Sequence, residues 1–284
     1  KSTAVNQNNT ELKESRKKKL PVYERADMLA NIVSLKKNII VTGSHGKTTT
    51  TSLIAKILSA ARLDPTIING GVINSLKSNA KFGKGEWAVL EADESDGSFL
   101  KLPINYSVVT NIDNEHLDFY KNYKNLQNAF LKFINKTPPI GKAIICLDDH
   151  CIKKNLKKLK TKNYLTYGFD NKSNYQITNV KYRINNTTFS LQIKIHGSKN
   201  ITVKNITLNL IGNYNVLNAT AAIAVCINLG INIKVIKEAL KKFSGVQRRL
   251  TKIFNKNKKE FYDDYAHHPT EISAVLHGLR QVYK

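Results

Sequence analysis

The run from residue 39 to residue 51, Ile-Ile-Val-Thr-Gly-Ser-His-Gly-Lys-Thr-Thr-Thr-Thr, constrains the fold more than any other part of the chain. It begins with β-branched apolar residues, which favour a buried strand. Gly43 and Gly46 then allow a tight turn and a close approach of the backbone to a ligand. After Lys47, apolar residues recur at helical spacing. The run therefore predicts a strand, a glycine-rich loop and a helix in succession.

A glycine-rich loop between a strand and a helix can bind phosphate. Backbone N–H groups and the helix dipole point at phosphate oxygens, Lys47 adds positive charge, and the Thr48 hydroxyl suits Mg²⁺. The general pattern G-x-x-x-x-G-K-[ST] has glycine where this chain has Val41, so only the shorter G-x-x-G-K-T form is present. We expect phosphate binding here; the alternative is a helix that begins with a threonine-rich turn.

Composition narrows the class of protein. The 284 residues allow one large or two ordinary domains, and a hydrophobic content of 41% is compatible with a core shared among α/β layers. No apolar run is long enough for a membrane span and no signal peptide is visible, so we expect no membrane insertion. The three cysteines form no Cys-x-x-Cys pair, which indicates free thiols and a cytoplasmic protein.

The net charge of +24 allows two interpretations. A basic protein can bind nucleic acid or an anionic membrane surface. The excess is nearly all lysine, however, with only seven arginines, and it is scattered along a chain rich in asparagine and isoleucine. Because nucleic-acid readers favour arginine for bidentate contacts, we interpret the charge as a compositional bias and expect no nucleic-acid partner.

Strand-like and helix-like segments alternate from residue 39 onward, which predicts an α/β fold with a mostly parallel sheet covered by helices. Between residues 164 and 210 short alternating strands dominate, with a turn at Asn185-Asn186, so we expect an antiparallel subsheet at the side of the same domain. The expected strands are residues 39–42, 66–68, 87–91, 107–110 and 143–147, and the expected helices include 47–61, 123–135, 213–228 and 234–243.

The two ends of the chain differ from this middle part. Residues before 39 are basic at first and then amphipathic at helical spacing around residues 28–33. After Gly245, strand-like runs at 252–254 and 261–265 and a helix from Pro269 predict the start of a new βα unit, which cannot bury a core of its own. Since the chain also lacks an initiating methionine, we expect it to be a fragment.

Polar residues follow two of the expected strands, at the sheet edge where ligands gather in α/β proteins. A carboxylate of the first group, residues 91–96, can hold Mg²⁺ or its waters opposite a P-loop threonine, although a solvated loop or helix start is the alternative. In the second group, residues 111–118, His116 can ligate a metal or transfer a proton, or be merely structural. Spacing does not show which acid acts.

Three later motifs each allow a functional and a structural interpretation. Asparagines at 213, 215 and 218 suit adenine recognition, whereas Asn213 or Asn215 can equally cap a helix. One guanidinium of Arg248-Arg249 can close over a phosphate, or the pair can lie on the surface. Residues 263–269 can bind a metal, but adjacent histidines rarely chelate together.

These blocks, in this order, resemble the Mur ligase family. The likeness spans nearly the whole chain and implies three parts: residues 1–35 as the tail of a UDP-binding domain, 36–246 as the complete central P-loop ATPase domain, and 247–284 as the start of a C-terminal ligase domain. Tyr214, Glu115 and Leu250 depart from the family pattern, which has histidine, aspartate and phenylalanine there. The segments that carry the likeness are 43–49, 91–99, 110–118, 215–218, 248–249 and 263–271.

The resemblance implies an ATP-dependent ligase of peptidoglycan precursor synthesis, and hence of cell-wall growth, shape and division. The expected reaction joins UDP-N-acetylmuramate to L-alanine through an acyl phosphate, with ATP and Mg²⁺. Two alternatives stay open: a ligase of the same family that adds a murein tripeptide, and a basic nucleic-acid-binding P-loop ATPase. A fragment on its own need not be active, and the sequence does not give the oligomeric state.

The resemblance also implies roles for single residues. Lys47 would hold the β- and γ-phosphates, Thr48 and Glu91 one Mg²⁺, and His116 a second Mg²⁺ near the substrate carboxylate, which makes Lys47, Glu91 and His116 the catalytic set. Two asparagines would face adenine, and an arginine and an aspartate would reach the nucleotide when the third domain closes. The expected nucleotide contacts are Gly43, Ser44, His45, Gly46, Lys47, Thr48, Thr49, Asn215, Asn218, Arg249 and Asp264.

Overall fold

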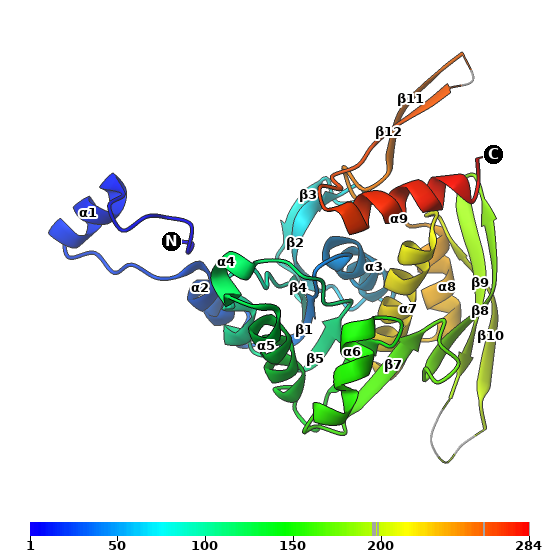
Figure 1. The fold of residues 1–284 in the computed structure, drawn as a ribbon, viewed down its shortest axis with the longest axis horizontal. Helices are drawn as coiled ribbons and strands as arrows, with labels where there is room; N and C mark the ends of the chain where they lie inside the picture. The colour runs from blue at the N-terminus through cyan, green and yellow to red at the C-terminus, as the bar shows by residue number, and fades with distance from the viewer. Residues whose placement is uncertain (195–196, 198, 258, 284) are drawn as a thin grey trace.

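A large twisted sheet organises the computed structural model, which describes residues 1–194, 197, 199–257 and 259–283 (Figure 1). In this described part ten strands form the sheet, in the order β10-β9-β8-β7-β6-β5-β1-β4-β2-β3. Their bounds are β1 Lys37–Thr42, β2 Thr66–Ile73, β3 Ser78–Lys81, β4 Trp87–Glu91, β5 Tyr106–Val109, β6 Lys142–Cys146, β7 Tyr164–Gly168, β8 Tyr175–Arg183, β9 Asn186–Ile193 and β10 Ile201–Leu208.

The middle of the sheet is parallel and its two edges are antiparallel. Strand β1 pairs in parallel with β4 and β5, and the parallel pairing continues through β6 and β7 to β8 on one side and to β2 on the other. Strands β8, β9 and β10 then run antiparallel, as do β2 and β3. Ile39, Ile40 and Val41 of β1 are fully buried, because a parallel strand is covered on both faces.

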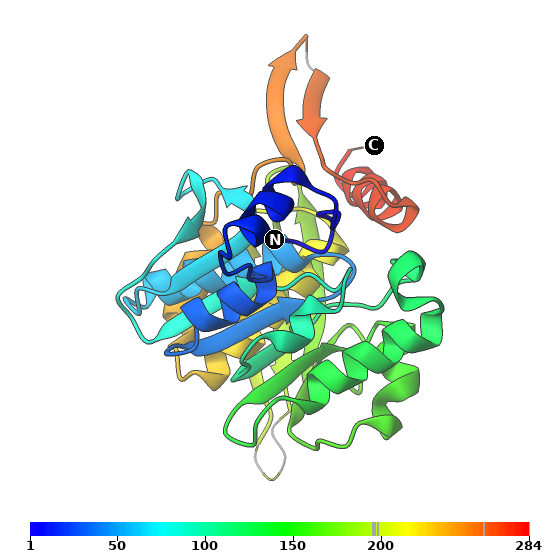
Figure 2. The same cartoon turned by 90° about the vertical axis from the view of Figure 1, so that its left-hand side faces the viewer.

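Helices cover the two faces of this sheet. Helices α3, α7 and α8 pack against one another on one face, while α2 and α5 lie on the opposite face (Figure 2). Phe99 and the α5 residues Phe130 and Phe133 form a buried aromatic group there. The helix bounds are α1 Thr10–Lys17, α2 Arg25–Ile32, α3 Lys47–Ala60, α4 Leu117–Tyr120, α5 Tyr123–Asn135, α6 His150–Asn155, α7 Asn213–Asn228, α8 Ile233–Lys241 and α9 Pro269–Arg280, with short 3₁₀ turns at Ser98–Lys101 and Leu156–Lys158.

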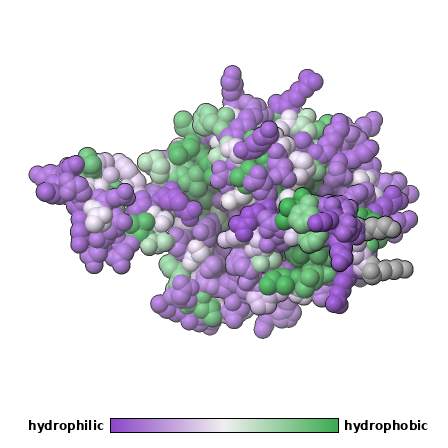
Figure 3. Space-filling model, turned by 90° about the horizontal axis from the view of Figure 1, so that it is seen from above, coloured by the Kyte–Doolittle hydropathy of each residue, from purple (hydrophilic) through white to green (hydrophobic). Residues whose placement is uncertain are grey.

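The end segments extend from this body. Helix α1 stands apart from it, at the tip of an arm that also protrudes in the view from above (Figures 1 and 3). Strands β11 (Thr251–Lys256) and β12 (Lys259–Asp263) form their own antiparallel sheet. Helix α9 then returns along α7, where Gly278 lies against Gly212 and the Tyr214 ring. The surface seen in Figure 3 is mostly hydrophilic, with apolar residues in small separate groups.

The structure confirms the expected fold class and corrects several details. Strand β4 and helices α5 and α7 have the predicted bounds. The hairpin turn lies at Ile184-Asn185, one residue earlier than predicted, because Arg183 pairs with Asn186. The two strands and the helix predicted after Gly245 are present as β11, β12 and α9, and the two strands pair with each other as a hairpin. Helices α1, α4 and α6 and strand β3 were not predicted.

Among the residues that the structure describes, no helix is both long enough and apolar enough to cross a bilayer.

Candidate active site

The predicted phosphate loop follows β1 and leads into α3, at the carboxyl edge of the parallel strands. Gly43 and Gly46 both have positive φ, 131° and 83°, which explains why glycine is needed at these positions. A Cβ on Gly46 would lie 2.4 Å from Oδ1 of Asn218, and one on Gly43 would lie 2.1 Å from Oγ1 of Thr110. The loop therefore fits closely between α7 and the end of β5.

The Lys47 ammonium folds back over this loop. It donates hydrogen bonds to the carbonyl oxygens of Gly43 (2.6 Å) and Ser44 (3.0 Å) and to Oε1 of Glu94 (2.9 Å). Glu94 is buried, and its second carboxylate oxygen has no hydrogen-bond partner among the described residues. Of the acids between 91 and 96, Glu94 is thus the one nearest to the lysine, which spacing could not reveal.

Glu91 connects the loop to strand β2. Its Oε1 accepts a hydrogen bond from the Thr48 hydroxyl at 3.0 Å, and its Oε2 accepts one from the Gly70 backbone N–H at 2.6 Å. A Cβ on Gly70 would collide with this carboxylate, so glycine at this position leaves room for it. The expected pairing of a P-loop threonine with an acid at the end of β4 is therefore present in the geometry.

His116 begins helix α4 with a left-handed backbone conformation. Its Nε2 lies 3.4 Å from Oε1 of Glu94 and 3.6 Å from Oε2 of Glu115. The hydrogen bond to Glu94 raises the pKa of His116 above its usual value by more than burial lowers it. Lys47, Thr48, Glu91 and His116 line one cavity of about 440 Å³, together with Ser44 and Arg249.

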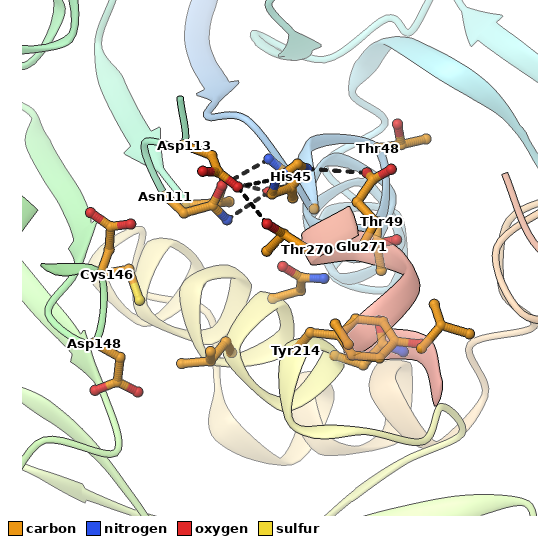
Figure 4. A pocket seen from close by; sticks show the side chains of 18 of the residues that line it. His45, Thr48, Thr49, Asn111, Asp113, Cys146, Asp148, Tyr214, Thr270 and Glu271 are labelled. Atoms are coloured by element: carbon orange, nitrogen blue, oxygen red, sulfur yellow. Dashed lines mark hydrogen bonds and ion pairs between the residues drawn. The ribbon is translucent and has the colours of Figure 1, made fainter. Parts of the chain in front are cut away.

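A second cavity, of about 550 Å³, adjoins the first on the side of α7 and α9 (Figure 4). Tyr214, Thr270 and Glu271 contribute to its lining. The two cavities share His45, Gly46, Thr48, Arg249 and Glu271. The expected nucleotide contacts that line the second cavity are His45, Gly46, Thr48, Thr49, Asn215, Asn218, Arg249 and Asp264.

The asparagines at the start of α7 do not cap that helix. The N-cap is Gly212, which offers no side chain, and Asn213 instead accepts a hydrogen bond from the Tyr182 hydroxyl. Asn215 donates to the Ile211 carbonyl oxygen at 2.8 Å, and Asn218 lies against the phosphate loop. Both side chains line the larger cavity, so the capping interpretation was wrong.

The segment after Val246 places one arginine of its pair toward the loop. The Arg249 guanidinium lies 3.5 Å from the Thr48 hydroxyl and 4.0 Å from Glu271, whereas the Arg248 side chain is 61% exposed. The Asp264 carboxylate accepts hydrogen bonds from the backbone N–H groups of Leu250 (2.6 Å) and Ala266 (2.8 Å). Asp264 thus fixes the local backbone while it faces the cavity.

A polar cluster around His45 lies where the two cavities meet. His45 Nε2 is 3.0 Å from Asp113 and 3.3 Å from Glu115, and its Nδ1 is 3.2 Å from Glu271. Burial lowers the pKa of His45, but its hydrogen bonds to Glu271 and Asp113 outweigh this and raise the pKa above its usual value. Burial opposes ionisation of Glu271, yet His45 and the neighbouring charges bring its pKa down to about 2.

Sequence reasoning did not find the partners in this cluster. It placed His45 in the loop, Glu115 in the polar group of residues 111–118 and His268 in a segment that can bind a metal, but it did not bring them together. His268 also belongs here, at 3.6 Å from both Asp113 and Glu115, while the next-door His267 side chain is 71% exposed. The signal available in the sequence was the position of Asp113 and Glu115 just beyond a strand end.

Comparisons with known proteins show the family to which this chain is similar. A family model described as the Mur ligase middle domain matches residues 41–226. The UDP-N-acetylmuramate–L-alanine ligases of Pelagibacter ubique and Agrobacterium fabrum are 58% identical over 283 residues and 44% identical over 284 residues, and both alignments cover 100% of the chain. The chain covers 61% and 60% of these relatives, about three-fifths of their length.

A solved structure has the same fold. The crystal structure of UDP-N-acetylmuramate-alanine ligase from Thermotoga maritima matches with a TM-score of 0.85 and 29% sequence identity. The match covers 99% of the chain and 63% of that protein.

Proposed function

Because the chain belongs to the Mur ligase family, we propose that its protein joins UDP-N-acetylmuramate to L-alanine at the expense of ATP. One observation carries the proposal: Lys47, Thr48, Glu91 and His116, from three different strand ends, line a single cavity. The names of the 58% and 44% identical relatives support the choice of substrates. We place the reaction in the cytoplasm, where ATP is available, and in peptidoglycan precursor synthesis.

The nucleotide would lie across both cavities. Its phosphates would contact the backbone N–H groups of the loop and the start of α3, a geometry suited to anions. Lys47, which now donates to loop carbonyl oxygens and Glu94, would turn its ammonium to the β- and γ-phosphates. The buried amides of Asn215 and Asn218 line the larger cavity and would face adenine. Arg249 and Asp264 would approach the nucleotide from the C-terminal segment.

The residues beside Lys47 suit Mg²⁺. This ion takes oxygen ligands at about 2.0–2.1 Å in an octahedral arrangement, so adjacent ligands lie about 3 Å apart. The Thr48 hydroxyl and the Glu91 carboxylate are 3.0 Å apart, which fits two adjacent positions. Glu94, whose buried Oε2 has no hydrogen-bond partner in the described part of the chain, and His116 lie in the same cavity and would face the second ion. When bound, Mg²⁺ supplies neutralisation of the charge on the transferred phosphoryl group.

The chemistry proceeds in two displacements. A carboxylate oxygen of the muramate attacks the γ-phosphorus of ATP and ADP leaves, which gives an acyl phosphate. The amine of L-alanine then attacks the acyl carbon, and phosphate departs from the tetrahedral intermediate. For this chain the task is mainly positioning and charge stabilisation, which phosphoryl transfer requires. We assign residues 36–246 to the ATP-binding domain, and residues 1–35 and 247–284 to the neighbouring two domains.

The substrate assignment is tested by phosphate release. The full-length protein is supplied with ATP, Mg²⁺ and UDP-N-acetylmuramate, and either single amino acids or the murein tripeptide. We expect the fastest release with L-alanine. Faster release with the tripeptide would contradict the choice of L-alanine, and release driven by nucleic acid without UDP-N-acetylmuramate would contradict the ligase assignment altogether.

The loop assignment is tested by Lys47→Ala. Removing a preorganised charge from a reaction centre typically lowers kcat about 100- to 1,000-fold. We expect Lys47→Ala to lower ATP turnover at least this much, which in practice abolishes it. Lys56→Ala is the matched control, since Lys56 lies in the same helix α3 but outside the lining of the two cavities described above. Normal turnover by Lys47→Ala would refute the role of the loop.

A further inference from the structure

Four potential metal-ligand atoms converge between the two cavities. They belong to His45, Asp113, Glu115 and His268, and one ligand atom from each residue lies within 4.8 Å of the others. The close contacts join Nε2 of His45 and Nδ1 of His268 to Oδ2 of Asp113 and Oε1 of Glu115. The His45 nitrogen is 3.0 Å from the Asp113 oxygen and 3.3 Å from the Glu115 oxygen. The His268 nitrogen is 3.6 Å from each of those oxygens.

These separations match the edges of a metal-centred tetrahedron. Zn²⁺ binds imidazole nitrogen and carboxylate oxygen at about 2.0–2.2 Å in tetrahedral sites, which places the ligand atoms about 3.3–3.6 Å apart. Four of the six separations among the cluster atoms are 3.0, 3.3, 3.6 and 3.6 Å. Two imidazoles and two carboxylates also form a donor set that balances the charge of a divalent ion.

A second set of contacts orients two of the four ligand residues, His45 and Asp113. Glu271 lies 3.2 Å from Nδ1 of His45, and a carboxylate at that nitrogen holds its proton there and leaves Nε2 free to bind a cation. The Thr270 hydroxyl donates to the same Asp113 oxygen at 2.8 Å (Figure 4). A metal-bound histidine almost always donates its other ring N–H to a carboxylate, a backbone carbonyl or a water. The only competing contact to His268 Nδ1 in the described residues is a long hydrogen bond, 3.4 Å, from the Thr270 backbone.

We propose that His45, Asp113, Glu115 and His268 form a Zn²⁺ site. It is separate from the Thr48–Glu91 pair assigned to Mg²⁺, and it does not depend on the ligase assignment. Its ligands come from the phosphate loop, from the segment after β5 and from the residue before α9. The ion therefore fastens the start of α9 to the phosphate loop, two parts of the chain that are far apart in sequence.

Direct metal titration tests the site. Untagged, chelator-treated protein at neutral pH is titrated with Co²⁺, followed by visible absorption, and with Zn²⁺, followed by calorimetry. We expect one equivalent of each metal to bind, with the intense d–d bands of tetrahedral Co²⁺, and Zn²⁺ to displace Co²⁺ and raise Tm. Absence of uptake, or only the weak bands of octahedral Co²⁺, would overturn the proposal and leave protons as the charges that hold the cluster together.

Two neighbouring histidines provide a matched pair of variants. His268→Gln removes a ligand and should abolish the tetrahedral Co²⁺ spectrum. His267→Gln changes an exposed side chain that contacts Glu271 at 3.4 Å but supplies no ligand, so the tetrahedral spectrum should persist. Circular dichroism of both variants checks that they fold. If His268→Gln bound Co²⁺ like the parent protein, the assignment of that ligand and of the site would be wrong.

A third variant tests the orienting carboxylate. Glu271→Gln keeps the shape of the side chain but weakens its hold on Nδ1 of His45. Loss of such an outer contact typically lowers metal affinity about 10- to 100-fold, so we expect tetrahedral binding to persist with a weaker Kd in that range. An unchanged Kd would contradict the orientation of His45 on which the site depends.

Discussion

The parallel sheet with its helices and the segment after Val246 are held in place by different forces. The sheet is stabilised by apolar side chains such as Ile39 and Ile144, which are fully buried. Beyond Val246, Gly278 is the only buried residue in the part of the segment that the structure describes. Ile253, for example, is 60% exposed. The segment contacts the body largely through polar groups of Arg249, Thr270 and Glu271.

This difference separates rigidity from adjustability in the site. The phosphate loop, Glu91 and His116 lie on strand ends that the buried core fixes. The segment after Val246 carries Arg249, His268 and Glu271, and its attachment depends on ion pairs and hydrogen bonds. These contacts stabilise less than the buried apolar core does, and they respond to pH. Substitutions and pH should therefore affect the two regions unequally.

The largest difference in the free energy of unfolding is expected when isoleucine is replaced by alanine once in the sheet and once in the segment after Val246. Ile144→Ala in β6 removes a fully buried side chain and should lower the free energy of unfolding by about 2–5 kcal/mol. Ile253→Ala in β11 changes an exposed side chain and should alter it by about 0.5 kcal/mol or less. Urea unfolding of both variants measures these values, and equal losses would break the distinction.

A smaller effect is expected where α9 rests on α7. A Cβ on Gly278 would lie 3.2 Å from Cα of Gly212, so Gly278→Val should push α9 away. We expect the local opening free energy of α9 to fall by about 1–3 kcal/mol, with the unfolding midpoint of the sheet unchanged. Hydrogen exchange of the α9 amides measures this. Leu276→Val, on an exposed position of the same helix, should leave exchange as it was.

The pair of His45 and Glu271 should give the segment a pH dependence. The pKa of Glu271 is lowered to about 2 from 4.5, so its contribution is present above pH 4.5 and is lost as the pH falls toward 2. The pKa of His45 is raised above 6.5, so its contribution is present below pH 6.5 and is lost as the pH rises through the folded-state pKa. This pair therefore stabilises the segment most between pH 4.5 and pH 6.5.

Thermal melts across this pH range, in the presence of a chelator, measure that contribution. Because both groups are partly exposed, we expect it to be about 1 kcal/mol, and Glu271→Gln should flatten both limbs of the pH profile. A profile that Glu271→Gln leaves unchanged would show that this pair does not stabilise the segment.

The smallest effect is expected on the surface of the body. Glu238 and Lys242 of α8 form an exposed ion pair at 3.8 Å. Glu238→Gln should change the free energy of unfolding by less than about 0.5 kcal/mol, because such pairs are screened by water. Glu238→Gln is also the matched control for Glu271→Gln. If Glu238→Gln lowered the free energy of unfolding more than Glu271→Gln, the location of a carboxylate in the site would not explain its contribution to stability.

Local sequence patterns were sufficient to predict the central strands and the phosphate loop, since both are determined by residues that are close together in the sequence. The run from residue 39 and the apolar spacing of α5 predicted those elements correctly. The pairing of β11 with β12 was not predicted, because strand-like runs do not show which strand they pair with. The cluster of His45 and His268 could not be predicted, because it forms only when α9 folds back over the phosphate loop.

Five residues form a common wall between the two cavities: His45, Gly46, Thr48, Arg249 and Glu271. A molecule that binds in one cavity and displaces Arg249 or Glu271 also changes the shape of the other cavity. Binding in the two cavities is then coupled. If a molecule in the first cavity changes the affinity for a molecule in the second by some factor, the second molecule changes the affinity for the first by the same factor.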